Sequence, residues 1–138
     1  MKDFGYIAAV SLEGRRAAVL ELKCASPHLA DSAEFQELAE KLCKLCAIYS
    51  PRWLSVESIP EAIKNSLLDD CRREAVKRGI PDHDAECYSQ ALFSSTADKM
   101  CLLSQTINGV PASEIIGKFS KSHGLIHVSR FYCMNSDQ

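Results

Sequence analysis

The chain has no long hydrophobic run, little imbalance of charge and few aromatic residues. Its 138 residues include 16 Lys and Arg against 18 Asp and Glu, a net charge of −2, so nothing indicates a basic surface for nucleic acid or an anionic membrane. No apolar run approaches the roughly 20 residues that a membrane span needs. Strand-like residues begin soon after Met1, without a signal or transit segment. These features favour a cytoplasmic globular protein with no nucleic-acid or membrane partner.

Patterns typical of catalysis are also missing. The four histidines are scattered along the chain, and no glycine-rich phosphate loop occurs. No candidate nucleophile has a neighbouring base in a recognisable pattern. We therefore expect no catalytic residue and no cofactor, and we interpret the chain as a binding protein that is not an enzyme.

Cysteine is the one residue type in excess, with seven in the chain. Without a secretion signal, we expect reduced and mostly buried thiols. Cys43 and Cys46 form a C-x-x-C pattern, and His83 with Cys87 has helical spacing, so the four together would suit zinc. Cys46 falls within the apolar face of a predicted helix and Cys43 at its edge, which favours core positions and no metal site. A thioredoxin-like role is disfavoured because the motif does not follow a strand.

Two β-favourable runs, residues 5–10 and 17–23, flank a short turn that contains Gly14. This arrangement predicts an antiparallel hairpin. Alternate residues of the second run would face the core: Ala18, Leu20 and Leu22. Residues 125–133 also alternate and are rich in β-formers, so we expect them to return and pair with the hairpin.

The first helix is predicted from a capping box at residues 31–34, with Asp31 as the cap, and from Pro51, which ends it. Its apolar face recurs with helical period at Phe35, Leu38, Ala39, Leu42, Leu45, Cys46 and Tyr49. A face of this width is typical of a helix that packs against a sheet.

Further helices are predicted over residues 60–78, from Asp82 onward and over residues 111–123. Residues 94–105 are ambiguous between the end of a helix and a buried extended run. Together these elements predict an α+β fold, in which about four helices cover one face of a three-stranded antiparallel sheet. We expect a single domain over residues 1–138.

The segment from Arg15 to Phe35 resembles the core signature of the translation elongation factor Ts family. In that family a strand ending L-V-E-L/V-N-C leads into an elbow typically written E-T-D-F-V, and a helix follows near E-F-Q. The strand at residues 19–24 and the helix at residues 33–39 match this pattern closely. The elbow differs, because Ser26-Pro27-His28-Leu29 stands where the family has Thr-Asp-Phe-Val.

The resemblance extends from about Tyr6 to Tyr132. Further matching segments, in the same order, are residues 49–55 (N-P-R/K-Y-V/L-S in the family), 57–60 (E-E-I/V-P), 73–81 (E-x-A…G-K-P), 101–105 (L-L-E-Q-P-F) and 127–131 (ending R-F-x). The resemblance implies the family's core, or dimerisation, domain in its short form. The family's N-terminal module, related to ubiquitin-associated domains, has no counterpart here, and residues 84–90 lack the family's basic, glycine-containing character.

The resemblance also implies a function, which is to bind elongation factor Tu and promote GDP release. In the family, the elbow phenylalanine wedges between helices near the magnesium site of that partner. Ser26, Pro27, His28 and Leu29 are then the partner-binding residues, with His28 at the wedge position and Pro27 at the aspartate position. Histidine is smaller and more polar than phenylalanine, so we expect weakened exchange. Alternatively, the elbow only joins the strand to the helix and contacts no partner.

Two function classes remain open. One is an exchange factor acting on elongation factor Tu. The other is a stand-alone interaction module with the same fold, which forms dimers through its sheet and has no exchange activity. By analogy with short members of the family, residues 125–133 are the candidate homodimer interface, with Cys133 as a candidate for a cross-link between copies.

Overall fold

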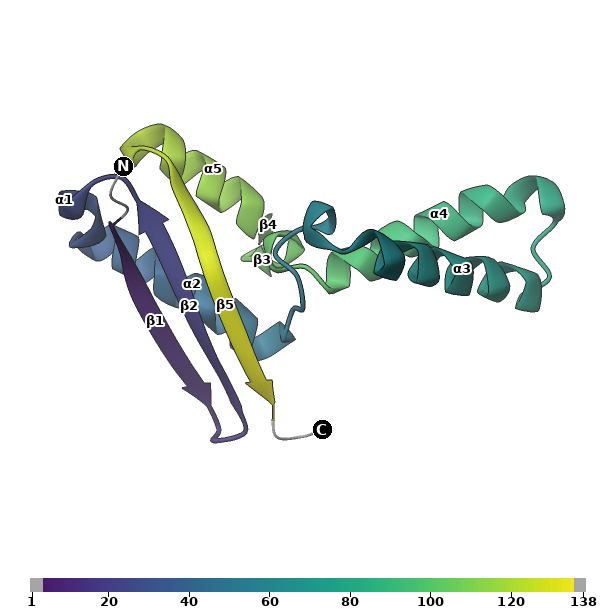
Figure 1. The fold of residues 1–138 in the computed structure, drawn as a ribbon, viewed down its shortest axis with the longest axis horizontal. Helices are drawn as coiled ribbons and strands as arrows, with labels where there is room; N and C mark the ends of the chain where they lie inside the picture. The colour runs from purple at the N-terminus through teal and green to yellow at the C-terminus, as the bar shows by residue number, and fades with distance from the viewer. Residues whose placement is uncertain (1–3, 136–138) are drawn as a thin grey trace.

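A computed structural model describes residues 4–135, which form an α+β fold around a three-stranded antiparallel sheet of order β1-β2-β5 (Figure 1). Its strands are β1 (Phe4–Leu12), β2 (Arg16–Cys24) and β5 (Ile126–Asn135). A small second sheet consists of β3 (Thr106–Ile107) and β4 (Val110–Pro111). The predicted class, the hairpin and the returning C-terminal strand are confirmed.

The helices are α1 (Pro27–Ala30), α2 (Ala33–Tyr49), α3 (Glu61–Lys77), α4 (Asp82–Lys99) and α5 (Ala112–His123), with 3-10 turns at Val56–Ser58 and Leu102–Ser104. A proline directly precedes α3, α4 and α5, where its fixed φ suits the start of a helix. The ambiguous region at residues 94–105 is now assigned: α4 continues to Lys99, and Cys101 then forms a short bridge with Trp53.

The main core lies between the sheet and α2. The predicted inward residues of β2 are buried, and α2 packs across β1, β2 and β5. Buried residues of α2 are Phe35, Leu38, Ala39, Leu42, Cys43, Leu45, Cys46 and Ala47. Tyr49 was predicted on this face but is 51% exposed. It occupies the last position of α2, where the next residue, Ser50, takes a left-handed conformation and turns the chain away.

A β-bulge sets which residues of β5 face the core. The pairing with β2 goes from Glu21–Arg130 to Leu22–Val128 and skips Ser129. Because the extra residue shifts the alternation, Val128 and Phe131 both contact the core although they are three residues apart. Beyond the bulge, Arg130, Tyr132 and Met134 are exposed, opposite the exposed side of β2.

Ser32, one residue after the predicted cap, is the N-cap of α2. Its Oγ accepts a hydrogen bond from the Phe35 backbone N–H at 3.2 Å and donates to the Leu29 carbonyl at 2.7 Å. Asp31 instead ends the short helix α1, which the sequence did not predict. The extra helical turn displaces the start of α2 by one residue.

We expect Ser32→Ala to lower the free energy of unfolding by about 1 kcal/mol, because two backbone groups lose their side-chain partner. Asp31→Ala is the matched control and should have a smaller effect. Urea unfolding followed by circular dichroism measures both, and an equal loss in the two variants would contradict the assignment of Ser32 as the cap.

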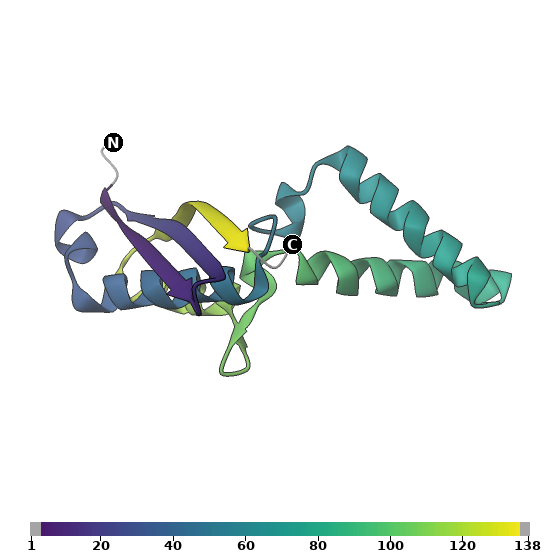
Figure 2. The same cartoon turned by 90° about the horizontal axis from the view of Figure 1, so that it is seen from below.

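Helices α3 and α4 form a hairpin that projects away from the sheet (Figures 1 and 2). The prediction of about four helices on one face is therefore refined: α1, α2 and α5 contact the sheet, whereas α3 and α4 chiefly contact each other. We call residues 61–99 the arm. No helix among the described residues 4–135 is long and apolar enough to cross a membrane.

Small side chains bring the two helices of the arm together. Cys71 and Ala75 of α3 and Ser89 of α4 are buried, and Arg72 of α3 makes two hydrogen bonds to the Glu86 carboxylate of α4, the shorter at 3.0 Å. At the base of the arm, a second apolar cluster joins it to the preceding connector: Ile59, Ala97 and Cys101 with Trp53, Val56, Ile63, Leu67 and Phe93. The arm thus has its own small core.

Candidate partner-binding site

The elbow between β2 and α2 is a defined turn of helix. Ser26 is the N-cap of α1, and its Oγ accepts a hydrogen bond from the Leu29 backbone N–H at 3.4 Å. Pro27 occupies the first helical position, where a backbone N–H is not needed. The Cys24 thiol donates to the Ser26 carbonyl at 3.2 Å and ties the end of β2 to the turn. The elbow is therefore held by its own hydrogen bonds.

The four predicted partner-binding residues are contiguous in this turn but differ in exposure. Pro27 and His28 are exposed, whereas Ser26 and Leu29 are half-buried. Leu29 packs against the main core, and the neighbouring Ala30 is buried. Ser26 and Leu29 thus fix the turn, and Pro27 and His28 are the residues that a partner would reach.

Leu125, which was predicted only as the first residue of a strand, lies next to the elbow. It precedes Ile126, whose partner in the sheet is Cys24, the last residue of β2. Its side chain is 80% exposed, and Gly124 before it has a positive φ of 104° that turns the chain from α5 into β5. The sequence signal that could have identified this exposed position is a glycine followed by a leucine between a predicted helix and a predicted strand.

Side chains of helix α5 contact the start of α2 at the end of the sheet that carries the elbow. The His123 Nε2 atom lies 3.1 Å from a carboxylate oxygen of Glu34, and the imidazole ring stacks on Phe119 with 4.4 Å between ring centroids. The Phe119 ring in turn packs at 6.4 Å from that of Phe35. These contacts hold the Gly124–Leu125 turn and the elbow at one end of the molecule.

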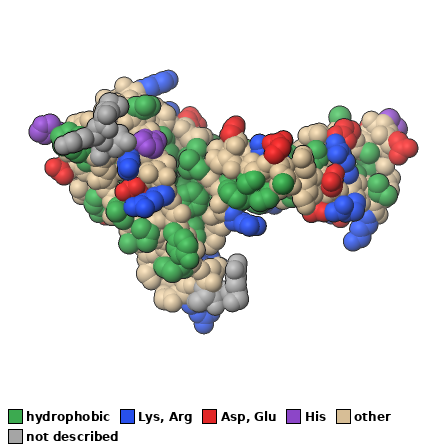
Figure 3. Space-filling view, viewed as in Figure 1, with side chains coloured by type: hydrophobic (Ala, Val, Ile, Leu, Met, Phe, Trp, Pro, Cys, Tyr) green, Lys and Arg blue, Asp and Glu red, His purple; other side chains and the backbone are tan. Residues whose placement is uncertain are grey.

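The outer face of the sheet, away from α2, carries exposed apolar side chains. They are Ile7 (57% exposed), Val19 (38%), Tyr132 (65%) and Met134 (48%). Register pairs Val19 with Tyr132 across β2 and β5, so these residues form one continuous surface. Figure 3 views this face and shows hydrophobic side chains gathered over the sheet beside a group of charged ones.

The charged side chains on the outer face are Glu21, Arg130 and Lys23. Glu21 Oε1 lies 3.3 Å from Arg130 Nε and 4.0 Å from Lys23 Nζ. A hollow of about 370 Å³ lies among Ile7, Val19, Glu21 and the β5 residues 130–132. The outer face therefore combines apolar contact area with a charged edge.

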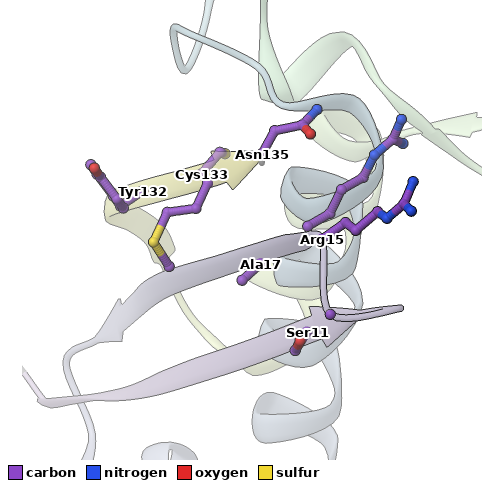
Figure 4. A pocket seen from close by; sticks show the side chains of 9 residues that line it. Ser11, Arg15, Ala17, Tyr132, Cys133 and Asn135 are labelled. Atoms are coloured by element: carbon purple, nitrogen blue, oxygen red, sulfur yellow. The ribbon is translucent and has the colours of Figure 1, made fainter. Parts of the chain in front are cut away.

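A second hollow of about 560 Å³ lies at the β1–β2 turn, at the opposite end of the sheet from the elbow (Figure 4). The labelled side chains around it are Ser11, Arg15, Ala17, Tyr132, Cys133 and Asn135. Arg16 also lines it and donates from Nη1 to the Ile48 carbonyl at 3.1 Å. Ala17 and Tyr132 belong to the outer face and Cys133 to the inner face, so this hollow lies at the end of the sheet beside a basic turn.

The C-x-x-C pair lies in the core. Cys43 and Cys46 are both 0% exposed, and the Cys43 thiol donates to the carbonyl oxygens of Ala18 at 3.2 Å and Ala8 at 3.5 Å. Burial raises the pKa of Cys43 to about 11. Within residues 4–135, no group of three or more His, Cys, Asp or Glu is placed to hold a metal ion.

Several curated proteins that are similar to this chain carry the same name. No family model matches the chain. Curated relatives named Elongation factor Ts include those of Thermotoga neapolitana, 28% identical over 91% of this chain and 64% of the relative, and of Fervidobacterium nodosum, 28% identical over 93% and 67%. The Thermosipho melanesiensis protein is 29% identical over 73% of this chain and 52% of its own length. The similarity covers nearly the whole chain and supports an elongation factor Ts-like core domain.

The chain spans about half to two thirds of the length of these elongation factor Ts relatives. The region of similarity includes nearly all of this chain, so the sheet, α2 and the arm all fall within it. The relatives are named for a factor of translation elongation, and that name describes those proteins.

Proposed function

We propose that this chain binds elongation factor Tu through the elbow and promotes GDP release more weakly than a factor with phenylalanine at the wedge position. The observation that carries the proposal is the exposed, hydrogen-bonded turn at Ser26–Leu29, which presents His28 in an elongation factor Ts-like core. In this role the chain is a cytoplasmic exchange factor and not an enzyme with its own active site.

Exchange by such a factor follows from thermodynamic coupling. A protein that binds the nucleotide-free form of its partner better than the GDP-bound form weakens GDP binding by the same factor. The wedge side chain supplies part of that preference, because the space it fills opens only when nucleotide and magnesium loosen. A smaller and more polar side chain, such as His28, buries less apolar area and supplies less.

Release of a fluorescent GDP from elongation factor Tu, with and without the chain, tests the proposal alongside a pull-down of the same pair. We expect binding with a modest acceleration of release. His28→Ala should reduce the acceleration and leave the pull-down largely intact, because the other elbow residues and the neighbouring Leu125 remain.

The control for this test is His83→Ala, which removes a histidine that is also exposed but lies on the arm. With this variant, elongation factor Tu should release GDP as fast as it does with the wild-type chain. Failure of the wild-type chain to bind elongation factor Tu would overturn the proposal. Equal effects of His28→Ala and His83→Ala on GDP release would show that His28 has no specific role in exchange.

A homodimer through the outer face of the sheet is a second candidate function, favoured by the continuous apolar surface of Ile7, Val19, Tyr132 and Met134. In a two-fold arrangement the same face of each copy would cover the other. The Glu21–Arg130 pair would lie within this face or at its edge and orient the two copies. This candidate is independent of exchange activity.

We expect Tyr132→Glu to weaken the dimer by roughly 30-fold or more, the effect of removing an aromatic residue from the centre of an interface and adding an uncompensated charge. Val76→Glu, at a 78% exposed position on the arm, is the matched control. Sedimentation equilibrium of the two variants and the wild type measures the change. A wild-type chain that stays monomeric at high concentration would contradict the second candidate.

A further inference from the structure

Two thiols from distant parts of the sequence meet where α2 ends. Cys133 of β5 pairs with Ala18 of β2, and Ala18 is also the residue whose carbonyl accepts the Cys43 thiol of α2. The side chain of Cys133 therefore lies on the inner face of the sheet, against the turn of α2 that carries the C-x-x-C pair. This placement directs Cys133 away from the outer face on which a second copy would pack.

Backbone contacts bring Cys46 and Cys133 to the same point. The Ser50 N–H donates to the Cys46 carbonyl at 2.9 Å, and the Cys133 thiol donates to the carbonyl of Pro51, the next residue, at 3.8 Å. The Cys46 and Cys133 thiols are close enough for each to shift the pKa of the other. Both cysteines are unoxidised in the structure.

The two thiols differ in access and in acidity. Cys46 is fully buried, whereas Cys133 is half-buried and lines a surface hollow of about 490 Å³ with Pro51 and Arg52. The hydrogen bond from Cys46 lowers the pKa of Cys133, and the same bond together with burial raises the pKa of Cys46. Cys133 is therefore the thiol that a small oxidant reaches first, and its lowered pKa favours the thiolate.

We propose that Cys46 and Cys133 form a peroxide-sensitive thiol pair that closes to an intramolecular disulfide. The Cys133 thiolate attacks one oxygen of hydrogen peroxide, the O–O bond breaks, and Cys133 becomes a sulfenic acid as hydroxide leaves and takes up a proton. The Cys46 sulfur then attacks the sulfenic sulfur, and the S–S bond forms as the Cys46 proton and the sulfenic hydroxyl leave as water. In total, two thiols and one peroxide give one disulfide and two waters.

The disulfide would change what the fold can do. It would join the C-terminal end of α2 to β5 and close a loop that contains the whole arm, which removes conformations from the unfolded chain. It would also consume Cys133, so oxidation would give a cross-link within one copy in place of the cross-link between copies that the sequence suggested.

Peptide mapping after oxidation tests the proposal on the full chain. The reduced protein is treated with hydrogen peroxide, remaining thiols are alkylated, and peptides are separated without reductant. We expect one linked pair that joins the Cys46 and Cys133 peptides, an intact mass lower by two hydrogen atoms, and a monomer on a non-reducing gel. We also expect a thermal midpoint that rises by roughly 10 °C and returns on reduction.

Variants locate the link. Cys133→Ser should abolish the loss of two hydrogens, whereas Cys87→Ser, which removes the exposed cysteine of the arm, should leave it unchanged. Cys46→Ala should leave Cys133 to accumulate as sulfenic acid, which dimedone traps. If that variant does not fold, the linked peptide of the wild-type chain decides alone. A link between other cysteines, a Cys133–Cys133 dimer, or full alkylation of both thiols after peroxide would each overturn the proposal.

Discussion

Replacing Phe35 by alanine is expected to lower the free energy of unfolding by about 3–5 kcal/mol. The Phe35 ring is 0% exposed in the first turn of α2 and belongs to the main core. It packs against Phe119, which links α2 to α5. Truncation removes the contacts of the whole ring, and the cavity cannot close without moving two helices that the cap of Ser32 and the His123–Glu34 pair hold in place.

Urea unfolding of Phe35→Ala against the wild type measures this loss. Tyr49→Ala is the matched control, an aromatic residue on the same helix that is half exposed, and it should lose no more than about 1 kcal/mol. Similar losses in the two variants would show that the burial of Phe35 does not govern stability.

The sequence predicts the sheet well because its signal is local. The period-two pattern of Ala18, Leu20 and Leu22 requires one buried face, and a turn with Gly14 requires a hairpin. A third β-favourable run at the end of the chain has few other places to pair. These predictions rest on alternation and turn chemistry, which depend little on the rest of the molecule.

The direction of the arm could not be predicted in the same way. The stripes of α3 and α4 contain small residues such as Cys71, Ala75 and Ser89, and a narrow stripe of this kind fits a second helix as well as it fits a sheet. Which of the two it meets is decided by the connector at Trp53, whose backbone bridges Cys101. That bridge is a contact between residues far apart in sequence, and no local pattern indicates it.

The local structure of the candidate site was predicted in part, and the partner-binding role of its residues stays a prediction. Ser26–Leu29 follows from the strand-to-helix transition and from the family resemblance, and these residues form one turn. The helical form of that turn was not predicted, although Pro27 suits the first helical position that it occupies in α1. Leu125 was missed because its place beside the elbow depends on pairing between Ile126 and Cys24. Pairing between distant strands is not visible in either segment alone.

His28→Phe is expected to increase the acceleration of GDP release from elongation factor Tu by about one to two decades. A phenylalanine buried at an interface contributes roughly 1.5–3 kcal/mol, which corresponds to that range of affinity for the nucleotide-free form. The exposed position of His28 leaves room for the larger ring, and the turn that carries it is held by Ser26 and Leu29 and not by His28 itself. The change should therefore alter the wedge and leave the fold as it is.

Stopped-flow release of fluorescent GDP at several concentrations of the chain measures the effect, and urea unfolding should show a change within about 0.5 kcal/mol. His83→Phe, the same substitution at an exposed position of the arm, is the matched control. With it, elongation factor Tu should release GDP as fast as with the wild-type chain. If the His28→Phe variant binds elongation factor Tu but accelerates GDP release no more than the wild-type chain does, the elbow does not enter the partner. The interaction module that forms dimers through the outer face of the sheet would then be the better account of this chain, because its apolar surface does not depend on the elbow.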